Sequence, residues 1–342
     1  MISQIGRKIF GLVLALAFLL PSALAQAQKY TLKLPTVISY ELNLPSLIAY
    51  AKDYFGEEGI KVEDFILGSG GTLRTLLITK DVDFALLAFP HIPIARQKGS
   101  LFKAILQMHE REIFSLAVRK GLQGKVRKIT DLKGMTIGFT RPGAGAWAWA
   151  MQYMKGSGLD PDRDVKMVAI GGNPGVIYNS LKTGMVDAYP TWEPTTTRLL
   201  EDGIVYLLVN IIDPKQHRQW VGADNALSLA LVTREDVIKE KPDLVRRMVN
   251  AHKKGLNFIR SHSAGEVVDT VMGNPKTAEQ FKGLKRALAI KVIDRIKGGF
   301  GDGRLSRSGF EAELKLGKKY GWVKKPMSFT DFANTSFAGE KP

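Results

Sequence analysis

The sequence has no cysteine among its 342 residues. This excludes disulfide bonds, thiolate metal sites, a cysteine nucleophile and the modified cysteine that anchors a bacterial lipoprotein. Histidine is also scarce: the five histidines are scattered, and none pairs with another at the spacing of a metal site. We therefore expect no bound metal, and a fold held together by packing alone.

Catalytic signatures are missing as well. The sequence has no P-loop, no G-x-S-x-G, no H-E-x-x-H and no EF-hand loop, and no nucleophile, base and orienting group stand out as a set. Gly143-x-Gly145-x-x-Ala148 matches a variant of the dinucleotide fingerprint, but Trp147 crowds the helix start and no acidic residue ends a following strand. We therefore expect no cofactor and no catalytic residue, and binding is favoured over catalysis.

Only one long apolar run occurs, at residues 9–20, and it is too short to span a bilayer comfortably. Arg7 and Lys8 precede it, and two Ala-x-Ala cleavage sequences follow within residues 23–27. This pattern predicts a signal peptide over residues 1–27 rather than an N-terminal membrane anchor. We expect the mature chain to begin just after one of these sequences and to be periplasmic.

Acidic residues are fewer than basic ones, 33 against 49, and the formal net charge is +16. The basic residues are dispersed, and their densest groups are short pairs near the C-terminus, Lys318-Lys319 and Lys324-Lys325. This distribution favours solubility and a mild attraction for anions over a nucleic-acid surface. We expect a monomer that binds a small-molecule solute and no nucleic acid.

Apolar residues make up 45% of the sequence, which is typical of a globular chain, and the length suggests two domains. Strand and helix patterns alternate in two successive runs and then become helical, which predicts a two-lobed α/β protein in which each lobe has a mostly parallel sheet flanked by helices. The expected strands are 30–35, 60–67, 82–87, 114–119, 135–140, 166–170, 187–190 and 204–209. The expected helices are 44–55, 72–79, 147–156, 175–183, one beginning at Pro242, 277–293 and 306–320.

The second run of elements is predicted to be inserted into the first lobe. Lobe I then comprises residues 28–117 and 229–342, with a helical C-terminal part, and lobe II comprises residues 118–228. The chain is expected to cross between the lobes near residues 117–118 and 228–231, which would form the hinge.

Ligands of open α/β sheets bind beyond the carboxyl ends of the strands. The loops at those ends are therefore predicted to supply the ligand-binding residues, half from each lobe. In lobe I they are Ser39, Tyr40, Ser69, Gly70, Gly71, Thr72, Phe89 and His91, and in lobe II they are Arg141, Gly143, Ala144, Gly145, Trp147, Asn173, Trp192 and Glu193.

Two of these loops combine glycine with a helix start, where backbone N–H groups can hold an oxyanion; the alternative is that the glycines only make tight turns. Arg141 adds a charge suited to a planar or tetrahedral anion. Trp147 and Trp149 cannot share a helix face, and Trp147 is expected to face the cleft because it lies nearer the helix start. Glu193 is either an acceptor for an amine or ring N–H of the ligand or an exposed carboxylate.

Another segment is rich in potential ligands but lies between two predicted strands. It reads His109-Glu110-Arg111-Glu112, and we expect it to face solvent. His252 is expected at the edge of the core or on the surface. His91 is the only histidine in a predicted ligand loop.

Several segments together resemble a known family. The sequence ITDLKGMTIG at 129–138, followed by a glycine-rich loop, resembles the "DLKGKTIG" segment of type 2 periplasmic binding proteins, and four further segments agree in order and spacing: VDFA at 82–85, LKTGMVDA at 181–188, WEP at 192–194 and KPDLV at 241–245. The family is that of the nitrate/sulfonate/taurine ABC-transporter periplasmic substrate-binding proteins, which share a fold with thiamine-pyrimidine-synthase-like proteins. The resemblance covers nearly all of the predicted mature chain.

This resemblance implies a receptor whose lobes close on a solute and present it to an ABC transporter permease in the inner membrane, with no chemistry performed. The sequence departs from the family at Lys80-Asp81, where a glycine is usual, and at Phe89-Pro90-His91, where many relatives have small polar residues. The substrate therefore stays open among nitrate, a sulfonate, taurine and an aminopyrimidine. Two alternatives are an enzyme on the same fold, of the pyrimidine synthase or desulfinase type, and a ligand-sensing subunit of a membrane receptor.

Overall fold

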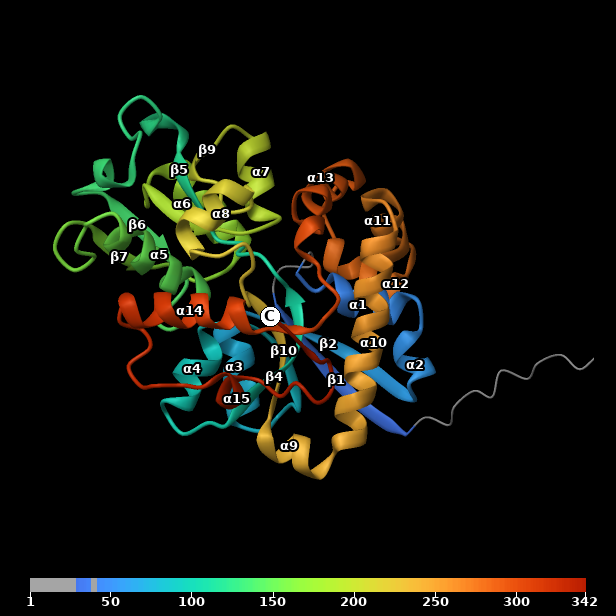
Figure 1. Ribbon diagram of the computed structural model, residues 1–342. Helices are drawn as coiled ribbons and strands as arrows, with labels where there is room; N and C mark the ends of the chain where they lie inside the picture. Colours follow the sequence, from blue (N-terminus) through green and yellow to red (C-terminus); the bar gives the residue numbers. More distant parts are fainter. Residues whose placement is uncertain (1–28, 38–41) are drawn as a thin grey trace, which may run out of the picture.

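The computed structural model describes residues 29–37 and 42–342 (Figure 1). The predicted signal peptide, 1–27, and the predicted ligand residues Ser39 and Tyr40 lie outside the described residues. Within the described ranges, no helix is both long and apolar enough to cross a bilayer.

The first lobe is built from the two ends of the chain. Its N-terminal part contains β1 (Tyr30–Val37), α1 (Leu44–Ala51), α2 (Tyr54–Glu57), β2 (Ile60–Gly68), α3 (Gly70–Ile78), β3 (Phe84–Ala88), α4 (His91–Arg96) and β4 (Phe102–His109). Its C-terminal part contains β10 (Leu229–Arg234), α9 (Glu235–Glu240), α10 (Pro242–Ser261), α11 (Ala264–Gly273), α12 (Pro275–Ala278), η3 (Glu279–Phe281), α13 (Arg286–Ile296), η4 (Lys297–Gly299), β11 (Leu305–Ser306), α14 (Arg307–Lys319), α15 (Phe329–Phe332) and β12 (Glu340–Lys341).

The second lobe is built from the middle of the chain and stands beside the first in Figure 1. It contains β5 (Ser115–Arg119), η1 (Lys120–Leu122), η2 (Ile129–Leu132), β6 (Thr136–Phe139), α5 (Gly145–Gly156), β7 (Lys166–Ala169), α6 (Pro174–Thr183), β8 (Ala188–Thr191), α7 (Thr195–Glu201), β9 (Val205–Val209) and α8 (Pro214–Val221). The predicted helix 44–55 is divided into α1 and α2 because Asp53 between them takes a left-handed φ of 58°. Strand β4 was not predicted.

The sheets are parallel except for one strand in each lobe. In the second lobe the strand order is β7-β6-β8-β5-β9, and β5 alone runs antiparallel to its neighbours. In the first lobe β1 and β2 are parallel, and β10 runs antiparallel between β3 and β4. The two reversed strands are those that follow a crossing between the lobes. The prediction of an α/β fold with mostly parallel sheets is thus confirmed, with one reversed strand per lobe.

The crossings themselves lie slightly away from the predicted hinge residues. Ala117 and Val118 are already paired with β8 and β9 in the second sheet, so the first crossing precedes Ser115. Helix α14 contacts α8 of the second lobe and α15 of the first, and lies across the junction in Figure 1. We propose that the connecting residues 110–114 and 222–228, rather than 117–118 and 228–231, are the hinge.

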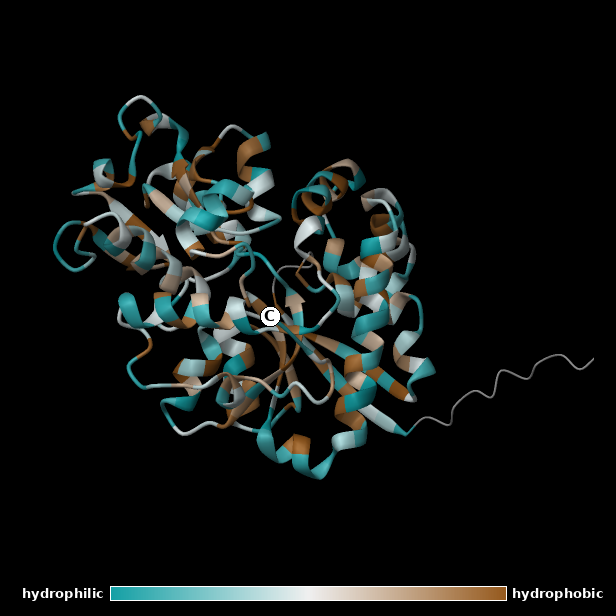
Figure 2. Ribbon diagram, viewed as in Figure 1, coloured by the Kyte–Doolittle hydropathy of each residue, from teal (hydrophilic) through white to brown (hydrophobic). Residues whose placement is uncertain are grey.

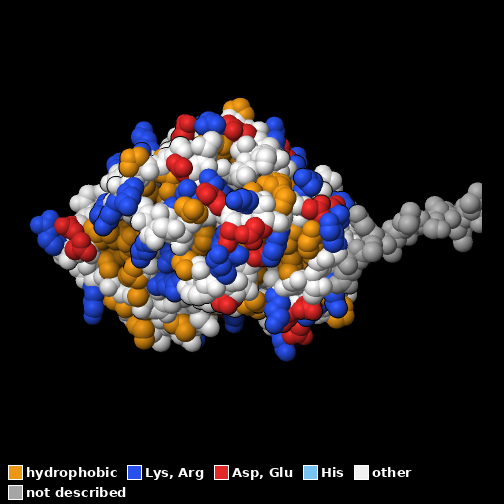
Figure 3. Space-filling view, turned by 90° about the horizontal axis from the view of Figure 1, so that it is seen from below, with side chains coloured by type: hydrophobic (Ala, Val, Ile, Leu, Met, Phe, Trp, Pro, Cys, Tyr) orange, Lys and Arg blue, Asp and Glu red, His pale blue; other side chains and the backbone are white. Residues whose placement is uncertain are grey.

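Hydrophobic residues gather on the strands and on the inner faces of the helices, and hydrophilic residues colour the outer faces (Figure 2). Helix α10 shows how the sequence sets this pattern: Leu244, Met248 and Ala251 recur at helical spacing and are fully buried. On the face drawn in Figure 3, Lys and Arg alternate with Asp and Glu. That face therefore shows no single basic patch.

Candidate ligand-binding site

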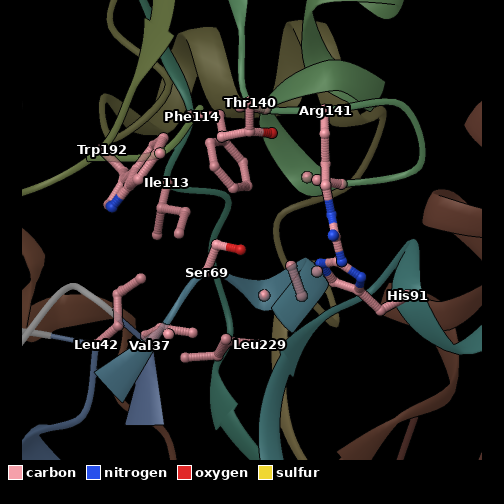
Figure 4. Close-up of a pocket in the computed structure, with 18 of the residues that line it drawn as sticks. Val37, Leu42, Ser69, His91, Ile113, Phe114, Thr140, Arg141, Trp192 and Leu229 are labelled. Carbon is pink, nitrogen blue, oxygen red and sulfur yellow. The ribbon is translucent and has the colours of Figure 1, made fainter. Parts of the chain in front are cut away.

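A cavity lies between the two lobes, at the carboxyl ends of the strands (Figure 4). Its volume is about 100 Å³. The wall is formed by Val37, Leu42, Gly68, Ser69, Gly70, Gly71, Ala88, His91 and Leu229 of the first lobe and its strand ends, by Ile113 and Phe114 of the connecting segment, and by Thr140, Arg141, Ala144, Gly145, Ala146, Gly171, Gly172 and Trp192 of the second lobe.

This wall brings together part of the predicted ligand set. The predicted residues that line it are Ser69, Gly70, Gly71, His91, Arg141, Ala144, Gly145 and Trp192. Sequence reasoning missed Ile113 and Phe114, because the connecting segment has no strand-end signal, and it missed the apolar side chains Leu42 and Leu229. Contact with a ligand stays a prediction for all of these residues.

Two helices point their N-termini at the cavity, one from each lobe. Ser69 caps α3 by accepting a hydrogen bond from the Thr72 N–H at 3.2 Å, while Gly70 and Gly71 at the first turn line the cavity. Ala144 caps α5 without any side-chain hydrogen bond. The first N–H groups of a helix have no partner within the helix, and the helix dipole favours negative charge there. The arrangement therefore suits an anion between α3 and α5.

Close contacts explain why glycine stands at two of these positions. A Cβ built on Gly71 would lie 1.7 Å from Nε of Arg141, so the guanidinium lies directly against the Gly71 backbone. A Cβ on Gly145 would lie 2.6 Å from the Phe114 ring. Glycine at these positions lets groups from the second lobe and the connecting segment approach helix starts closely.

The substitution Gly71→Ala separates a structural from a functional role of this glycine. Helical alanine ordinarily stabilises a protein relative to glycine by about 0.4–1 kcal/mol, and Arg141 can swing away because only its flexible end is displaced. We expect an unfolding temperature equal to or above that of the wild type, together with at least about tenfold weaker anion binding. Calorimetric titration and thermal unfolding measure the two effects. A stable variant with unchanged affinity would show that the Arg141 position is irrelevant to binding.

Positive groups cluster at one end of the cavity. Nη1 of Arg74 lies 2.9 Å from the carbonyl oxygen of Gly143, to which it donates across the lobe boundary, and 3.5 Å from Nδ1 of His91. Burial, together with the charges of Arg74 and Arg141, lowers the pKa of His91 to about 3, so this ring is neutral at pH 7. Burial and the charge of Arg141 also lower the pKa of Arg74. Both guanidiniums therefore share one poorly solvated region.

No carboxylate balances these charges in the described wall of the cavity. Two polar atoms there, Nε of Arg141 and Oγ1 of Thr140, are buried and have no hydrogen-bond partner among the described residues. Buried polar groups are almost always paired, so unpaired donors beside unbalanced positive charge indicate a position for an anionic group. Because Nδ1 of His91 faces a guanidinium donor, Nε2 carries the proton and is a further donor.

The opposite end of the cavity is apolar. The Trp192 and Phe114 rings meet edge to face with centroids 5.7 Å apart, and Ile113 lies beside them. Figure 4 shows Trp192, Ile113, Val37, Leu42 and Leu229 on the side away from Arg141 and His91. The cavity is therefore amphipathic, with an anion-binding end and an apolar end.

Three predicted ligand residues, Thr72, Phe89 and Gly143, lie outside the cavity wall. Thr72 is exposed, because it belongs to the capping turn of α3, where its hydroxyl is 2.9 Å from that of Ser69. Phe89 is 1% exposed and stacks on Phe332 at 4.6 Å in the core. Gly143 has φ of +78° and offers only its carbonyl, which accepts from Arg74.

Trp147, Asn173 and Glu193 also lie outside the cavity wall. The α5 residues that line the cavity precede Trp147, and Trp149 is buried in the lobe core against Tyr153 at 5.3 Å, so neither tryptophan faces the ligand position. Asn173 caps α6, where its side chain accepts from the Gly175 N–H at 2.9 Å. Capping thus engages the Asn173 side chain.

Glu193 is neither exposed nor in the cavity wall, and its carboxylate pairs with an arginine of the other lobe. It is 2% exposed, accepts from Nε of Arg295 at 2.8 Å and from the Thr197 N–H at 3.0 Å. Arg295 belongs to α13 of the first lobe, and Lys291 on the same helix pairs with Glu201 of α7 at 2.6 Å. These two ion pairs join the lobes beside the cavity.

Two residues of the segment 109–112 are buried, contrary to the expectation that it faces solvent. His109 and Glu112 are each 2% exposed, whereas Glu110 and Arg111 are partly exposed. His109 packs edge to face on Phe300 at 5.0 Å. The Glu112 carboxyl hydrogen-bonds to that of Glu313 from α14, and burial raises the pKa of both groups. His252 is fully buried and lies 2.9 Å from the Ser46 hydroxyl. No group of three or more His, Asp or Glu within residues 29–37 and 42–342 is placed to hold a metal ion.

A comparison with known protein families identifies the family of this chain. The family model described as "NMT1/THI5 like" matches residues 43–265. The chain belongs to the NMT1/THI5-like family. Among curated proteins, it is similar to the riboflavin-binding protein RibY of Chloroflexus aurantiacus, with 26% identity over 69% of this chain. The match spans 64% of RibY, so less than two thirds of that relative is represented.

Solved structures of similar fold include two binding proteins. The alkanesulfonate-binding protein SsuA from Xanthomonas axonopodis pv. citri, bound to MOPS, has a TM-score of 0.69 at 16% identity, covering 87% of this chain and 96% of that one. The nitrate-binding protein NrtA from Synechocystis PCC 6803 has a TM-score of 0.70 at 16% identity, covering 90% and 84%. The NMT1/THI5-like chain thus has the periplasmic binding protein fold, and the resemblance read from the sequence motifs is confirmed.

Proposed function

We propose that this protein is a periplasmic solute receptor of an ABC importer, and that its ligand is a small organic anion with an apolar body. The observation that carries the proposal is the Arg141 guanidinium at one end of the cavity, with the Arg74 guanidinium 3.5 Å from His91 of the wall and no carboxylate in the described wall. An anionic head group would balance the two charges. The apolar body would pack against Trp192, Phe114 and Ile113.

The cavity size limits the ligand. One enclosed water requires roughly 10–15 Å³ of such volume, so about 100 Å³ holds roughly seven to ten water-sized groups. A ligand of similarly many non-hydrogen atoms would fill the cavity. Nitrate, with four atoms, would leave the apolar end filled with water, whereas an aryl or alkyl sulfonate or carboxylate would occupy both ends.

The absence of a carboxylate from the described wall also weighs against a zwitterion. The sequence offered Glu193 as an acceptor for an amine, but that carboxylate is engaged with Arg295 and the Thr197 N–H. An ammonium group in the cavity would meet Arg74 and Arg141 instead, at a Coulomb cost. Taurine and aminopyrimidines are therefore disfavoured relative to simple anions.

Both lobes supply the wall, so a bound ligand would stabilise the closed form over the open one. Closure would strengthen the polar contacts by removing water from around them. Names of relatives agree with such a role: SsuA and NrtA are binding proteins, and RibY is described as binding riboflavin. A transporter permease that distinguishes closed from open receptor would then be the partner.

An enzyme on the same fold is the competing proposal. A Ser-His pair needs a carboxylate on the second ring nitrogen to orient the imidazole and stabilise its charged form. In this cavity Nδ1 of His91 faces the Arg74 guanidinium, which opposes protonation. This geometry favours hydrogen bonding to an anion over base catalysis.

The test is thermal unfolding of the mature protein after any co-purified ligand has been removed by unfolding and refolding. The panel comprises nitrate, taurine, hexanesulfonate, benzenesulfonate, hexanoate, benzoate, an aminopyrimidine and riboflavin. A ligand at 100 times its Kd adds about 2.7 kcal/mol of stability, which raises the unfolding temperature by roughly several degrees in a chain of this length. We expect the alkyl and aryl anions to give the largest shifts. Larger shifts with taurine, nitrate or riboflavin would contradict the proposed ligand class.

A further inference from the structure

We propose that the groove lined by Tyr178, Thr195, Arg198, Gln280 and Lys282 is a second binding subsite, which holds the far, acceptor-bearing end of an elongated ligand. The ligand class would be an organic anion with a carboxylate or similar acceptor group at each end. This inference rests on the proposed function, in which the inner cavity holds the first anionic group.

The groove is larger than the inner cavity and is also formed by both lobes. Its volume is about 210 Å³, against about 100 Å³ for the inner cavity. The wall comprises Leu67, Gln280, Lys282, Gly283 and Leu284 from the first lobe, and Pro174, Tyr178, Pro194, Thr195 and Arg198 from the second.

The groove and the inner cavity are two stretches of one cleft. Leu67 lines the groove, and its chain neighbour Gly68 lines the cavity. On the facing lobe, Gly172 lines the cavity, and Pro174, two residues later, lines the groove. In the same way, Trp192 lines the cavity and Pro194 lines the groove. Since successive Cα atoms are 3.8 Å apart, the two walls are separated by only about 4–7 Å of backbone, within reach of one small molecule.

Hydrogen-bond donors in the groove lack partners. Nε2 of Gln280 and Oγ1 of Thr195 are buried and have no hydrogen-bond partner among the described residues, and Thr195 is only 3% exposed. Buried donors of this kind point to an acceptor supplied from outside the chain. They indicate a built polar site rather than a gap between lobes.

Two cations line the same groove. The Arg198 guanidinium lies 5.3 Å from the centre of the Tyr178 ring, and Arg198 and Lys282 both line the groove. Their carboxylate neighbours Asp202 and Glu279, at 3.9 and 3.7 Å, do not line it. A carboxylate entering the groove would therefore meet donors and positive charge. A hydrocarbon chain in the groove would leave these donors without hydrogen-bond partners.

The experiment compares two probe series in calorimetric titrations: straight-chain monocarboxylates and α,ω-dicarboxylates of the same lengths. Without the subsite, a second carboxylate would have to be desolvated at the apolar end, and dicarboxylates would bind more weakly. With it, the dicarboxylate of best length should bind at least about tenfold more tightly than its matched monocarboxylate. Arg198→Met should remove this advantage while leaving monocarboxylate affinity within about twofold.

Four variants make the outcomes separable. Gln280→Leu should also reduce the dicarboxylate advantage, whereas Arg163→Met, which removes an exposed arginine outside both cavities, should preserve it. Absence of the advantage at every length, or its persistence in both Arg198→Met and Gln280→Leu, would overturn the subsite while the receptor stands. Failure of both series, or binding unaffected by Arg141→Met, would overturn the proposed function itself and the subsite with it.

Discussion

Replacing Arg141 by methionine is expected to weaken binding of alkyl or aryl anions by at least about 100-fold, or about 2.7 kcal/mol. The guanidinium lies against the start of α3, and its buried Nε has no partner among the described residues, so the ligand would supply its main acceptor. Each hydrogen bond to a charged group contributes about 1.5–3 kcal/mol, and a guanidinium can donate two to one anion. Calorimetric titration measures the loss.

The stability of the Arg141→Met protein should stay the same or rise, although its affinity falls. Arg141 and Arg74 repel each other without a carboxylate in the cavity wall, so removing one charge relieves that repulsion. We expect the ligand-free Arg141→Met protein to unfold at a temperature equal to or above that of the wild type. Arg141→Lys should recover affinity only in part, because lysine lacks the planar fork. A variant that unfolds earlier and still binds within threefold would show that Arg141 is structural.

Three buried histidines are held neutral, and each should contribute a loss of stability as the pH falls. His217 donates from Nδ1 to the Ala223 carbonyl and accepts the Glu112 N–H, and His252 donates to the Met248 carbonyl and accepts from Ser46. Burial lowers the pKa of both to about 4, and that of His91 to about 3, from 6.5.

The sign of the pH effect follows from proton counting. Between pH 6.5 and about 4 the unfolded chain binds up to three more protons than the folded one, so stability falls as pH falls, by about 4 kcal/mol per pH unit at the steepest. Between pH 7 and 5 the histidines alone would cost about 5 kcal/mol of stability, and the buried Glu112–Glu313 pair offsets much of this loss in the same window. The Glu112–Glu313 pair acts oppositely: raised pKa values make its contribution fall as pH rises toward about 7.

Denaturant unfolding at pH 5, 6, 7 and 8, of the wild type and of single variants, separates the two opposing contributions. His252→Gln keeps a donor and an acceptor but cannot take up a proton, so the acid slope should fall by about one proton, or 1.4 kcal/mol per pH unit. Glu313→Gln should remove part of the opposing contribution and so steepen the loss of stability between pH 7 and 5. An acid slope that is unchanged in His252→Gln would contradict the assignment of a neutral, buried His252.

The sequence predicted the layout of the fold well because hydrophobic periodicity and glycine turns are local signals. The helix begun by Pro242 and the strands ending at Gly68 and Phe139 follow such patterns. Strand β4 escaped because its pattern includes buried polar residues: Gln107 is fully buried, donating to the Ala226 carbonyl and accepting from the Ser306 N–H. That pairing joins segments more than a hundred residues apart.

The predicted site residues line the cavity where backbone geometry decides their position, and lie outside its wall where side chains choose between partners. Gly70, Gly71 and Gly145 line the cavity because helix starts at strand ends must lie there. Glu193 instead meets Arg295, about one hundred residues later in the chain, and no local pattern reveals such a pairing. Arg74 was missed although it follows Gly70 by one helical turn, a spacing that places both near the same end of α3.

The Glu193–Arg295 pair would set the rate at which the proposed receptor opens. Opening the cleft would have to separate a carboxylate that is 2% exposed from its guanidinium before water can reach it. Such a separation places a barrier in the opening step itself, independent of the ligand. Ligands of quite different affinity would then depart at rates limited by one common event, and their affinities would differ mainly through association. Residence time would become a property of the protein, set by helices α7 and α13 rather than by the cargo.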